Sequence, residues 1–272
     1  MASTCPTPTP ITTYTFHEAN LTDVLPHAWV FLLGRRASRK TTWAKYLHNV
    51  LEAKQFDEVD VLCGNRVCRF EWRDLLKDPT KAHLVEKVED KVTVMECILR
   101  EQETKIQRLK NHPRFAKIPF KDVVIPQALR RCIILDDCEG HPSFWTSPTM
   151  RKLATYEQRH NLGVFVICVT NYFVRHFRPN YLLLTSNCNT FNQKFFWKRL
   201  KGYVKDEKAM NVVLNRMLKD GGITWLDVQG PTRQTRLFWA RALQFPLAWN
   251  RHQILRRIRE PPWKRPKLCY GV

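Results

Sequence analysis

Residues 29–47 read WVFLLGRRASRKTTWAKYL, and this stretch carries the signals that decide the fold. Its opening apolar run is typical of a buried strand, Gly34 ends the run, and apolar residues recur at helical spacing from Thr41 onward. A strand, a glycine-led loop and a helix in this order match a Walker A loop, G-x-x-x-x-G-K-[ST]. Gly34 takes the first glycine position, Lys40 the lysine position and Thr41 the hydroxyl position. The stretch therefore predicts a phosphate-binding loop at a helix N-terminus.

One position departs from the pattern, because Arg39 stands where the second glycine belongs. Glycine there permits a close backbone approach and backbone angles that a side chain disfavours. Two interpretations stay open: Arg39 is tolerated and its charge favours phosphate, or the loop is degenerate and binds nucleotide poorly. In a working loop Lys40 reaches the β- and γ-phosphates of ATP and Thr41 binds Mg²⁺. Thr42 is grouped with them as nucleotide-binding.

A second apolar run, residues 132–135, ends in two neighbouring carboxylates, Asp136 and Asp137. This is the pattern of a Walker B strand, in which Asp136 holds the metal and Asp137 orients and polarises the attacking water. The alternative is a strand that ends in a solvated Asp turn. The joint interpretation is favoured because both motifs follow buried strands in the expected order.

Polar residues also follow the next buried run, residues 164–169. Asn171 is a candidate sensor of the γ-phosphate, and a plain strand-terminating turn explains it equally well. Arg175 and Arg178 follow closely and are candidate arginine fingers, acting in the same subunit or across a subunit boundary. General surface basicity explains these two arginines nearly as well.

Strand patterns alternating with helix patterns predict an α/β domain with a mostly parallel sheet flanked by helices, a P-loop NTPase of the RecA/ASCE-like type. The expected layout is a flexible leader over residues 1–24, the ATPase domain over 25–230 and a basic tail over 231–272. A long amphipathic helix is expected as an insert over about 81–109, with Gln102 as the one polar lapse in its apolar stripe. Packing of that stripe on the domain is favoured over an intermolecular coiled coil. Residues 67–72 are interpreted as a short strand, and residues 145–160 as a helix with a start signal at Ser147-Pro148.

Charge and composition limit the partners and the compartment. The 272 residues carry 45 Lys and Arg against 25 Asp and Glu, a formal charge of +20, which favours a polyanionic partner. The nine cysteines are scattered without a zinc-binding spacing, so a reducing compartment is expected. No apolar run approaches the roughly 20 residues needed to cross a bilayer, so an intracellular, soluble protein without a membrane partner is expected.

Residues 29–184 resemble the viral A32-like genome-packaging ATPases of the FtsK–HerA superfamily. Three segments carry the resemblance: GRRASRKTT (34–42), IILDDCEG (133–140) and RHNLGVFVICVTNYFVRHFRPNYLLL (159–184). The resemblance implies an ATP-driven, Mg²⁺-dependent motor that works as a homo-oligomeric ring and threads double-stranded DNA into a capsid. It also implies capsid or portal proteins as partners. Ala37 and Arg39 depart from the family pattern, and this puts hydrolysis, more than the fold, in doubt.

Two other functions remain as alternatives to the motor. One is a non-catalytic DNA-binding or capsid-adaptor protein on a degenerate P-loop fold, which Arg39 supports. The other is a nucleotide or nucleoside kinase, which the second carboxylate, Asp137, and the large basic excess argue against. The basic clusters at 256–259 and 264–267 fit a nuclear localisation signal or a DNA grip, and a solvated basic tail without a dedicated role explains them equally well. The host nucleus is the expected compartment, with the host cytoplasm as the alternative, and association with the virion is expected.

Overall fold

A computed structural model describes residues 17–18, 27–36, 38–115, 118–119, 123–138, 142–171, 177, 179–185, 223–227 and 236–240. In this part of the chain one sheet has the strand order β1-β9-β8-β7-β2-β6-β5-β3-β4. The strands are β1 (His17–Glu18), β2 (Trp29–Leu33), β3 (Glu58–Cys63), β4 (Ala82–Leu84), β5 (Arg131–Asp136), β6 (Val164–Thr170), β7 (Tyr181–Thr185), β8 (Ile223–Asp227) and β9 (Arg236–Ala240).

Six neighbouring strands, from β7 to β4 in that order, run parallel to one another. β8 is antiparallel to β7 and β9, and β1 is parallel to β9. The strand of the glycine-led loop, β2, and the Asp-Asp strand, β5, are separated by β6 alone. Parallel strands need crossover connections, and helices lie in those that join β2 to β3, β3 to β4, β4 to β5 and β5 to β6. The predicted α/β P-loop NTPase fold is confirmed.

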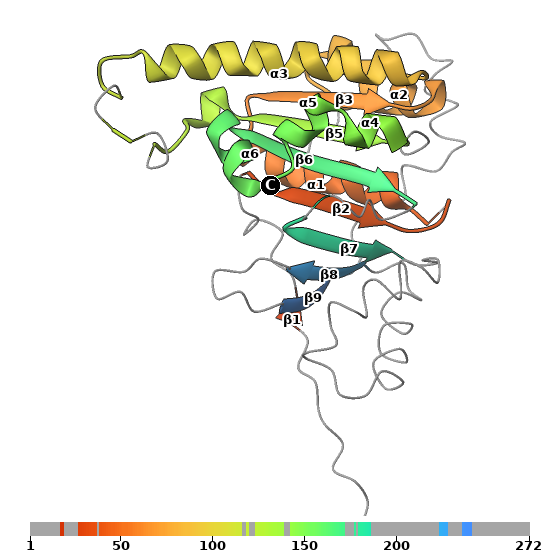
Figure 1. Ribbon diagram of the computed structural model, residues 1–272. Helices are drawn as coiled ribbons and strands as arrows, with labels where there is room; N and C mark the ends of the chain where they lie inside the picture. Colours follow the sequence, from red (N-terminus) through yellow and green to blue (C-terminus); the bar gives the residue numbers. More distant parts are fainter. Residues whose placement is uncertain are drawn as a thin grey trace, which may run out of the picture.

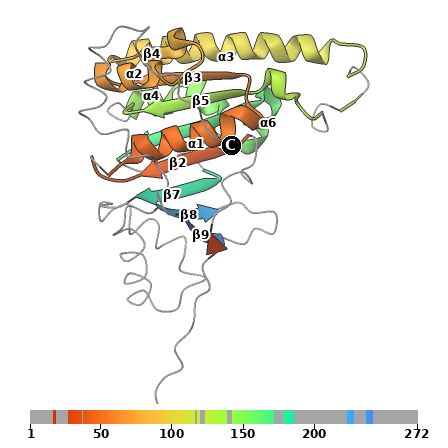
Figure 2. The ribbon, with the colours of Figure 1, turned by 180° about the vertical axis from the view of Figure 1, so that it is seen from behind.

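Helices cover both faces of the sheet (Figures 1 and 2). β2 shows why, since all five of its residues are buried and alternate ones join different cores. Trp29, Phe31 and Leu33 pack in one core and Val30 and Leu32 in the other. The second core holds apolar residues of α1 (Lys40–Gln55) and α2 (Arg66–Arg73). The first holds α3 (Val88–Lys110), α4 (Pro142–Thr146), α5 (Pro148–Lys152) and, less deeply, α6 (Tyr156–Leu162).

The long helix α3 packs on the sheet by one stripe, as predicted, but it begins at Val88 instead of near residue 81. The short 3₁₀ helix η2 (Pro79–Lys81) and β4 occupy the start of the predicted range, and β4 pairs with β3. Gln102 is buried in the stripe, and its amide donates to the carbonyl oxygens of Leu129 and Leu162, each at 2.7 Å. The one polar residue of the stripe therefore binds the carbonyl groups of the last residues of η4 (Gln127–Leu129) and α6.

A network of buried ions joins α3 to the amino ends of β3 and β5. Arg131, the first residue of β5, is fully buried and forms ion pairs with Glu58, Asp60 (2.9 Å) and Glu101 (2.7 Å). Lys105 of α3 also pairs with Glu58. Each buried charge thus has an opposite charge beside it, which is the condition under which buried ions are tolerated.

Two further predictions of secondary structure differ from the structure. Residues 67–72, interpreted as a strand, lie in α2, because Asn65 caps the helix by accepting from Cys68 N and because the buried residues Cys68 and Trp72 fall one helical turn apart. The single helix expected over 145–160 is divided into three short helices. Ser147 caps α5 and Thr155 caps α6, so new helices begin at these residues.

The sheet also extends into the segments assigned to the leader and the tail. β1 lies within residues 1–24 and β9 within residues 231–272, and the two strands pair with each other. The remaining residues of both segments, and the two basic clusters near the end, lie outside the described residues. No helix in the described part is both long enough and apolar enough to span a bilayer.

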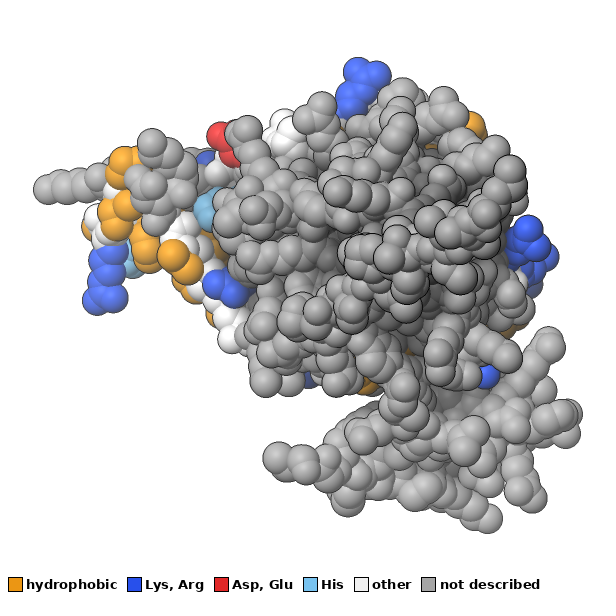
Figure 3. Space-filling model, turned by 90° about the horizontal axis from the view of Figure 1, so that it is seen from below, with side chains coloured by type: hydrophobic (Ala, Val, Ile, Leu, Met, Phe, Trp, Pro, Cys, Tyr) orange, Lys and Arg blue, Asp and Glu red, His pale blue; other side chains and the backbone are white. Residues whose placement is uncertain are grey.

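The segment that follows α3 projects from one end of the sheet (Figure 1). It includes Ile118, exposed to 43%, and Val124, exposed to 76%. Seen from below, apolar, basic and histidine side chains lie together at this projecting end (Figure 3). This end is opposite to the one at which the six parallel strands terminate.

Candidate functional site

The predicted site residues come together at the carboxyl ends of the parallel strands. β6 lies between β2 and β5, and the register pairs Leu33 with Thr170 and Asp136 with Val169. The three strands therefore end at nearly the same level. The loop after Leu33 and the polar residues after Thr170 and Asp136 emerge side by side at this edge, the usual place for a ligand in an open parallel sheet.

The loop starts with a glycine because no side chain fits there. A Cβ at Gly34 would overlap the hydroxyl oxygens of Ser38 and Thr185. Those two hydroxyls share a hydrogen bond of 2.7 Å, and Thr185 Oγ1 also donates to the Leu33 carbonyl oxygen at 3.1 Å. Ser38 and Thr185 are buried, so they fasten the loop to the neighbouring strand β7.

Arg39 adopts the conformation for which the Walker A pattern uses glycine. Its φ of 65° and ψ of 21° lie in the left-handed region, immediately before α1. A residue with a Cβ pays about 1–2 kcal/mol for this conformation. The Arg39 carbonyl oxygen accepts the first helical hydrogen bond, from Trp43 N at 3.0 Å, and the side chain is exposed. The arginine thus preserves the glycine-like backbone path into α1.

Lys40 lies under the loop, with its ammonium group in contact with three oxygen atoms. It donates to the carbonyl oxygens of Gly34 (2.9 Å) and Arg35 (2.8 Å) and to Asn171 Oδ1 (2.9 Å). The lysine is largely buried, and Asn171 is partly buried. The contact joins the predicted lysine and the predicted sensor directly, across 131 residues of sequence.

Asp136 is a buried carboxylate with hydrogen bonds from neutral groups. Thr41 Oγ1 donates to its Oδ1 at 3.2 Å, and Trp72 Nε1 donates to its Oδ2 at 2.8 Å. Burial raises the pKa of Asp136 above the usual range, while the hydrogen bonds from Trp72, Cys68 and Thr41 and the more distant charge of Lys45 act against that rise. The site therefore contains a carboxylate whose negative charge is poorly compensated by the protein.

Asp137 differs from its neighbour, because it is exposed and its backbone is left-handed, with a φ of 60°. Its Oδ2 accepts a hydrogen bond of 2.5 Å from Asn65 Nδ2. The backbones of β3 and β5 approach closely here, since Gly64 N donates to the Asp136 carbonyl oxygen at 3.0 Å and a Cβ at Gly64 would overlap the Asp137 carbonyl. Asp137 is thus held in place by the residues that follow β3.

The structure brings together most of the residues that the sequence singled out. Lys40 and Asn171 touch, Thr41 and Asp136 touch, and Thr42 lies partly exposed in the first turn of α1. Arg175 and Arg178 lie outside the described residues.

Sequence reasoning missed four residues that hold this site: Ser38, Asn65, Trp72 and Thr185. Asn65 was detectable as a helix cap, had residues 67–72 been interpreted as a helix. The other three required knowledge of which strands are neighbours.

The described residues contain no cluster of three or more His, Cys, Asp or Glu side chains suited to a metal ion. A metal at this site would therefore rely on Asp136 and the Thr41 hydroxyl, and would take its remaining ligands from water or from a bound phosphate. Mg²⁺ is commonly held in this way, through one or two carboxylates together with substrate phosphates.

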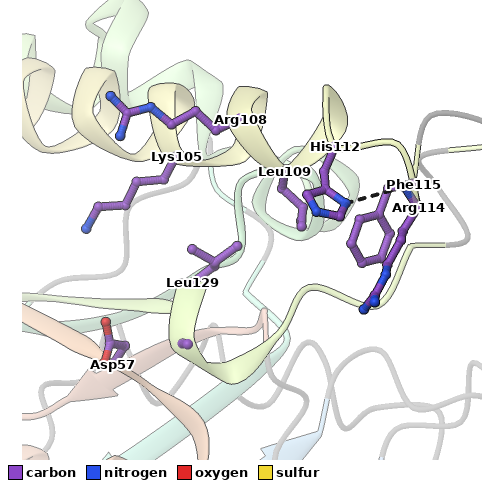
Figure 4. Close-up of a pocket in the computed structure, with 9 residues that line it drawn as sticks. Asp57, Lys105, Arg108, Leu109, His112, Arg114, Phe115 and Leu129 are labelled. Carbon is purple, nitrogen blue, oxygen red and sulfur yellow. Dashed lines mark hydrogen bonds between the residues drawn. The ribbon is translucent and has the colours of Figure 1, made fainter.

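A separate cleft of about 600 Å³ lies at the opposite edge of the sheet, beside the end of α3 (Figure 4). Its lining combines basic side chains with an apolar floor: Asp57, Lys105, Arg108, Leu109, His112, Arg114, Phe115, Ala128 and Leu129. Asp57 precedes β3 and Leu129 precedes β5, so the cleft lies at the amino ends of these strands. It shares no residue with the predicted nucleotide site.

No protein-family model and no curated protein sequence matches this chain. Among solved structures, it is similar to the genome packaging NTPase B204 from Sulfolobus turreted icosahedral virus 2. The complex with ATP-gammaS gives a TM-score of 0.42 at 14% identity, covering 79% of this chain and 98% of that one. The complex with sulfate gives 0.45 at 14% identity, covering 82% and 100%.

The DNA-packaging ATPase B204 from Sulfolobus turreted icosahedral virus gives a TM-score of 0.42 at 16% identity, covering 78% of this chain and 97% of that one. Scores of this size do not by themselves establish a shared fold. The fold of this chain is instead established by its own strand order and by the loop that joins β2 to α1.

Proposed function

We propose that the chain is a P-loop ATPase that serves as a genome-packaging motor subunit and moves double-stranded DNA into a viral capsid. The observation that carries the nucleotide part is the buried Asp136 carboxylate, hydrogen-bonded to the Thr41 hydroxyl at the start of α1. A buried carboxylate with only neutral hydrogen-bond donors is suited to a cation, and the N-terminus of α1 is suited to the phosphates that accompany it.

The nucleotide would be held by groups that already converge at this edge. Backbone N–H groups at the start of α1 and the Lys40 ammonium would bind the phosphates, and Thr41 and Asp136 would hold Mg²⁺. Bound Mg²⁺ would neutralise charge on the phosphates. Lys40 would exchange at least one of its oxygen partners for phosphate, and Asn171, now bonded to Lys40, lies where that exchange would be sensed.

Asp137 is the residue proposed to orient the attacking water and accept its proton. It is exposed at the same edge, one residue after the metal carboxylate. Its hydrogen bond to Asn65 uses one carboxylate oxygen and leaves the other for water. Arg175 and Arg178 remain the proposed arginine fingers.

The DNA and packaging part of the proposal is supported by charge and by the sequence resemblance. A formal charge of +20 suits a protein that grips phosphates without reading bases. The three segments 34–42, 133–140 and 159–184 resemble packaging ATPases, and this resemblance implies a ring with capsid or portal partners. We extend the proposal to such a ring, associated with the virion and active in the host nucleus.

A second candidate, a non-catalytic DNA-binding or adaptor protein, is favoured by the loop itself. Arg39 holds a strained conformation, and the ammonium of Lys40 is occupied by oxygen atoms of the protein. If both features resist change, ATP would not bind. The left-handed backbone conformation of Arg39 supports the ATPase, because it is the conformation for which the Walker A pattern uses glycine.

ATP hydrolysis with and without duplex DNA separates the two candidates. The motor predicts DNA-stimulated hydrolysis that disappears in Asp137→Asn, while ATP binding persists. The matched control is Asp57→Asn, which removes an exposed carboxylate at the opposite edge and should keep the wild-type rate. Normal DNA binding with no calorimetric signal for ATP in the wild type would instead establish the adaptor.

A further inference from the structure

Helix α2 contacts both carboxylates of the proposed catalytic pair. Asn65, its cap residue, donates to Asp137, and Trp72, the residue before its last, donates to Asp136 Oδ2. The thiol of Cys68 lies 3.9 Å from the Asp136 carbonyl oxygen on the same inner side. Thus one helix of eight residues holds both acidic side chains.

The opposite side of α2 is exposed and basic. Arg66, Phe70 and Arg73 fall at helical spacing on one stripe, and the Arg66 side chain is 84% exposed. Phe70 is 38% exposed and Val67 beside it is 69% exposed. Arg66 has one long contact of 3.7 Å to the exposed Glu86, and Arg73 has no ion pair within the described residues. Both guanidinium groups are therefore available to a partner.

Asn65 links the first turn of α2 to Asp137. Its Oδ1 accepts from Cys68 N at 2.8 Å, which fixes it to the first turn of α2, and its Nδ2 donates to Asp137. The backbone has little room to move here, because Gly64 packs directly against the Asp137 carbonyl group. A displacement of α2 would therefore move Asn65 and change the hydrogen bond to Asp137.

We propose that the outer face of α2, defined by Arg66, Val67, Phe70 and Arg73, contacts the phosphate backbone of duplex DNA and transmits that contact to Asp136 and Asp137. This rests on the proposed ATPase function and adds where the DNA acts and through which residues. Charge favours DNA as the ligand of this face. The face presents two arginines with available guanidinium groups, and the whole chain has a formal charge of +20. α2 lies at the edge to which the parallel strands point (Figures 1 and 2).

The surface is tested with Arg66→Ala/Arg73→Ala and with the matched control Arg108→Ala/Arg114→Ala, which removes two arginines from the cleft at the opposite edge. Affinity for a short duplex is measured against salt concentration, and ATP turnover with and without that duplex. The α2 variant should lose about two units of salt slope, roughly 0.9 for each phosphate contact removed. It should keep the basal turnover and lose the stimulation by DNA, and the control should keep the stimulation.

The transmission is tested with Asn65→Asp, because aspartate also caps helices and in its ionised form cannot donate to Asp137. This variant should keep wild-type DNA affinity and lose the stimulation, and its unchanged circular dichroism would show that α2 is folded. Asn65→Ser gives a second variant that keeps a capping hydroxyl but is too short for the same contact. Asn65 acts here as a positioning residue, and the ratio of stimulated to basal turnover is the quantity that reports it.

Three results would overturn the inference. If Arg66→Ala/Arg73→Ala binds the duplex with the wild-type salt slope, the DNA contact lies elsewhere. If Val67→Ser/Phe70→Ser alters the sedimentation coefficient but neither DNA affinity nor stimulation, the face is a protein interface. If Asn65→Asp keeps the stimulation, α2 does not transmit. Failure of the proposed function gives a different result, because the wild type would then not hydrolyse ATP. The salt dependence of DNA affinity would still show whether DNA binds at α2.

Discussion

The two ends of strand β5 each bury a charged residue, and they treat that charge in opposite ways. At the amino end, Arg131 is fully buried and forms ion pairs with three carboxylates, those of Glu58, Asp60 and Glu101. At the carboxyl end, Asp136 is 2% exposed and receives hydrogen bonds from a hydroxyl and an indole, with no cation at ion-pair distance in the described part of the chain.

This difference indicates what each end is for. The charge of Arg131 is neutralised by the carboxylates around it and needs no ligand, and its pair with Glu101 fixes α3 to the sheet. A buried carboxylate without a counterion disfavours its own ionised form, and the energy is recovered only when a cation arrives. The same strand therefore has a structural end and a binding end, and substitutions at the two ends should have separable effects.

The largest effect on stability is expected at the structural end. Arg131→Gln removes the cation from three carboxylates, and breaking such a network by deleting one partner costs about 3–5 kcal/mol. The free energy of unfolding in urea should fall by that amount, while ATP affinity of the folded fraction stays near wild type. Arg108→Gln, at an exposed site on α3, serves as control. Loss of less than 1 kcal/mol, on the order of a surface pair, would contradict the structural assignment.

A smaller change of opposite sign is expected at the binding end. Because the folded-state pKa of Asp136 is raised, its ionisation lowers stability as pH rises from the usual aspartate range, about 3.9, through the folded-state pKa. Each pKa unit of that rise corresponds to about 1.4 kcal/mol. Asp136→Asn removes the titration, so without Mg²⁺ it should unfold at a higher temperature than wild type at pH 7. The two proteins should converge at acid pH, and a less stable variant at pH 7 would refute the sign.

The smallest effect is expected in the loop that joins β2 to α1. Arg39→Gly relieves a left-handed residue but adds freedom to the unfolded chain, so the net gain in unfolding free energy should be no more than about 1 kcal/mol. Arg39→Ala keeps a Cβ at the same backbone angles and should show no gain. ATP affinity of the glycine variant then decides between the two interpretations of this position. A far tighter complex marks the wild-type loop as impaired, and an equal one marks Arg39 as tolerated.

Much of the fold could be predicted because it is written in local patterns. The apolar runs of β2, β5 and β6 are short and end in polar residues, which is how strands buried on both faces appear in a sequence. Since the carboxyl ends of parallel strands share an edge, Lys40, Asp136 and Asn171 could be expected near one another. The structure adds that Lys40 and Asn171 are in direct contact.

The remainder depends on contacts between segments that are distant in the sequence. Trp72 bonds to Asp136 across 64 residues, and Ser38 bonds to Thr185 across 147. Nothing local identifies these partners, because they are set by which strands are neighbours. α2 was interpreted as a strand since its apolar residues lie close together, although the polar cap at Asn65 favoured a helix. Gln102 stands out in the sequence as a polar residue in an apolar stripe, but its two partners, the carbonyl groups of Leu129 and Leu162, are visible only in the structure.

The claim that Asp136, at the end of β5, is a metal-binding carboxylate is tested most directly by calorimetric titration of ATP with Mg²⁺ and with EDTA. Wild type and Asp136→Asn are compared under both conditions. We predict that wild type binds ATP more tightly with Mg²⁺ than with EDTA, and that Asp136→Asn binds it equally under the two conditions. An Mg²⁺-dependent gain that survives in Asp136→Asn, or wild-type binding that ignores Mg²⁺, would contradict the assignment of this end of β5 as the metal-binding end.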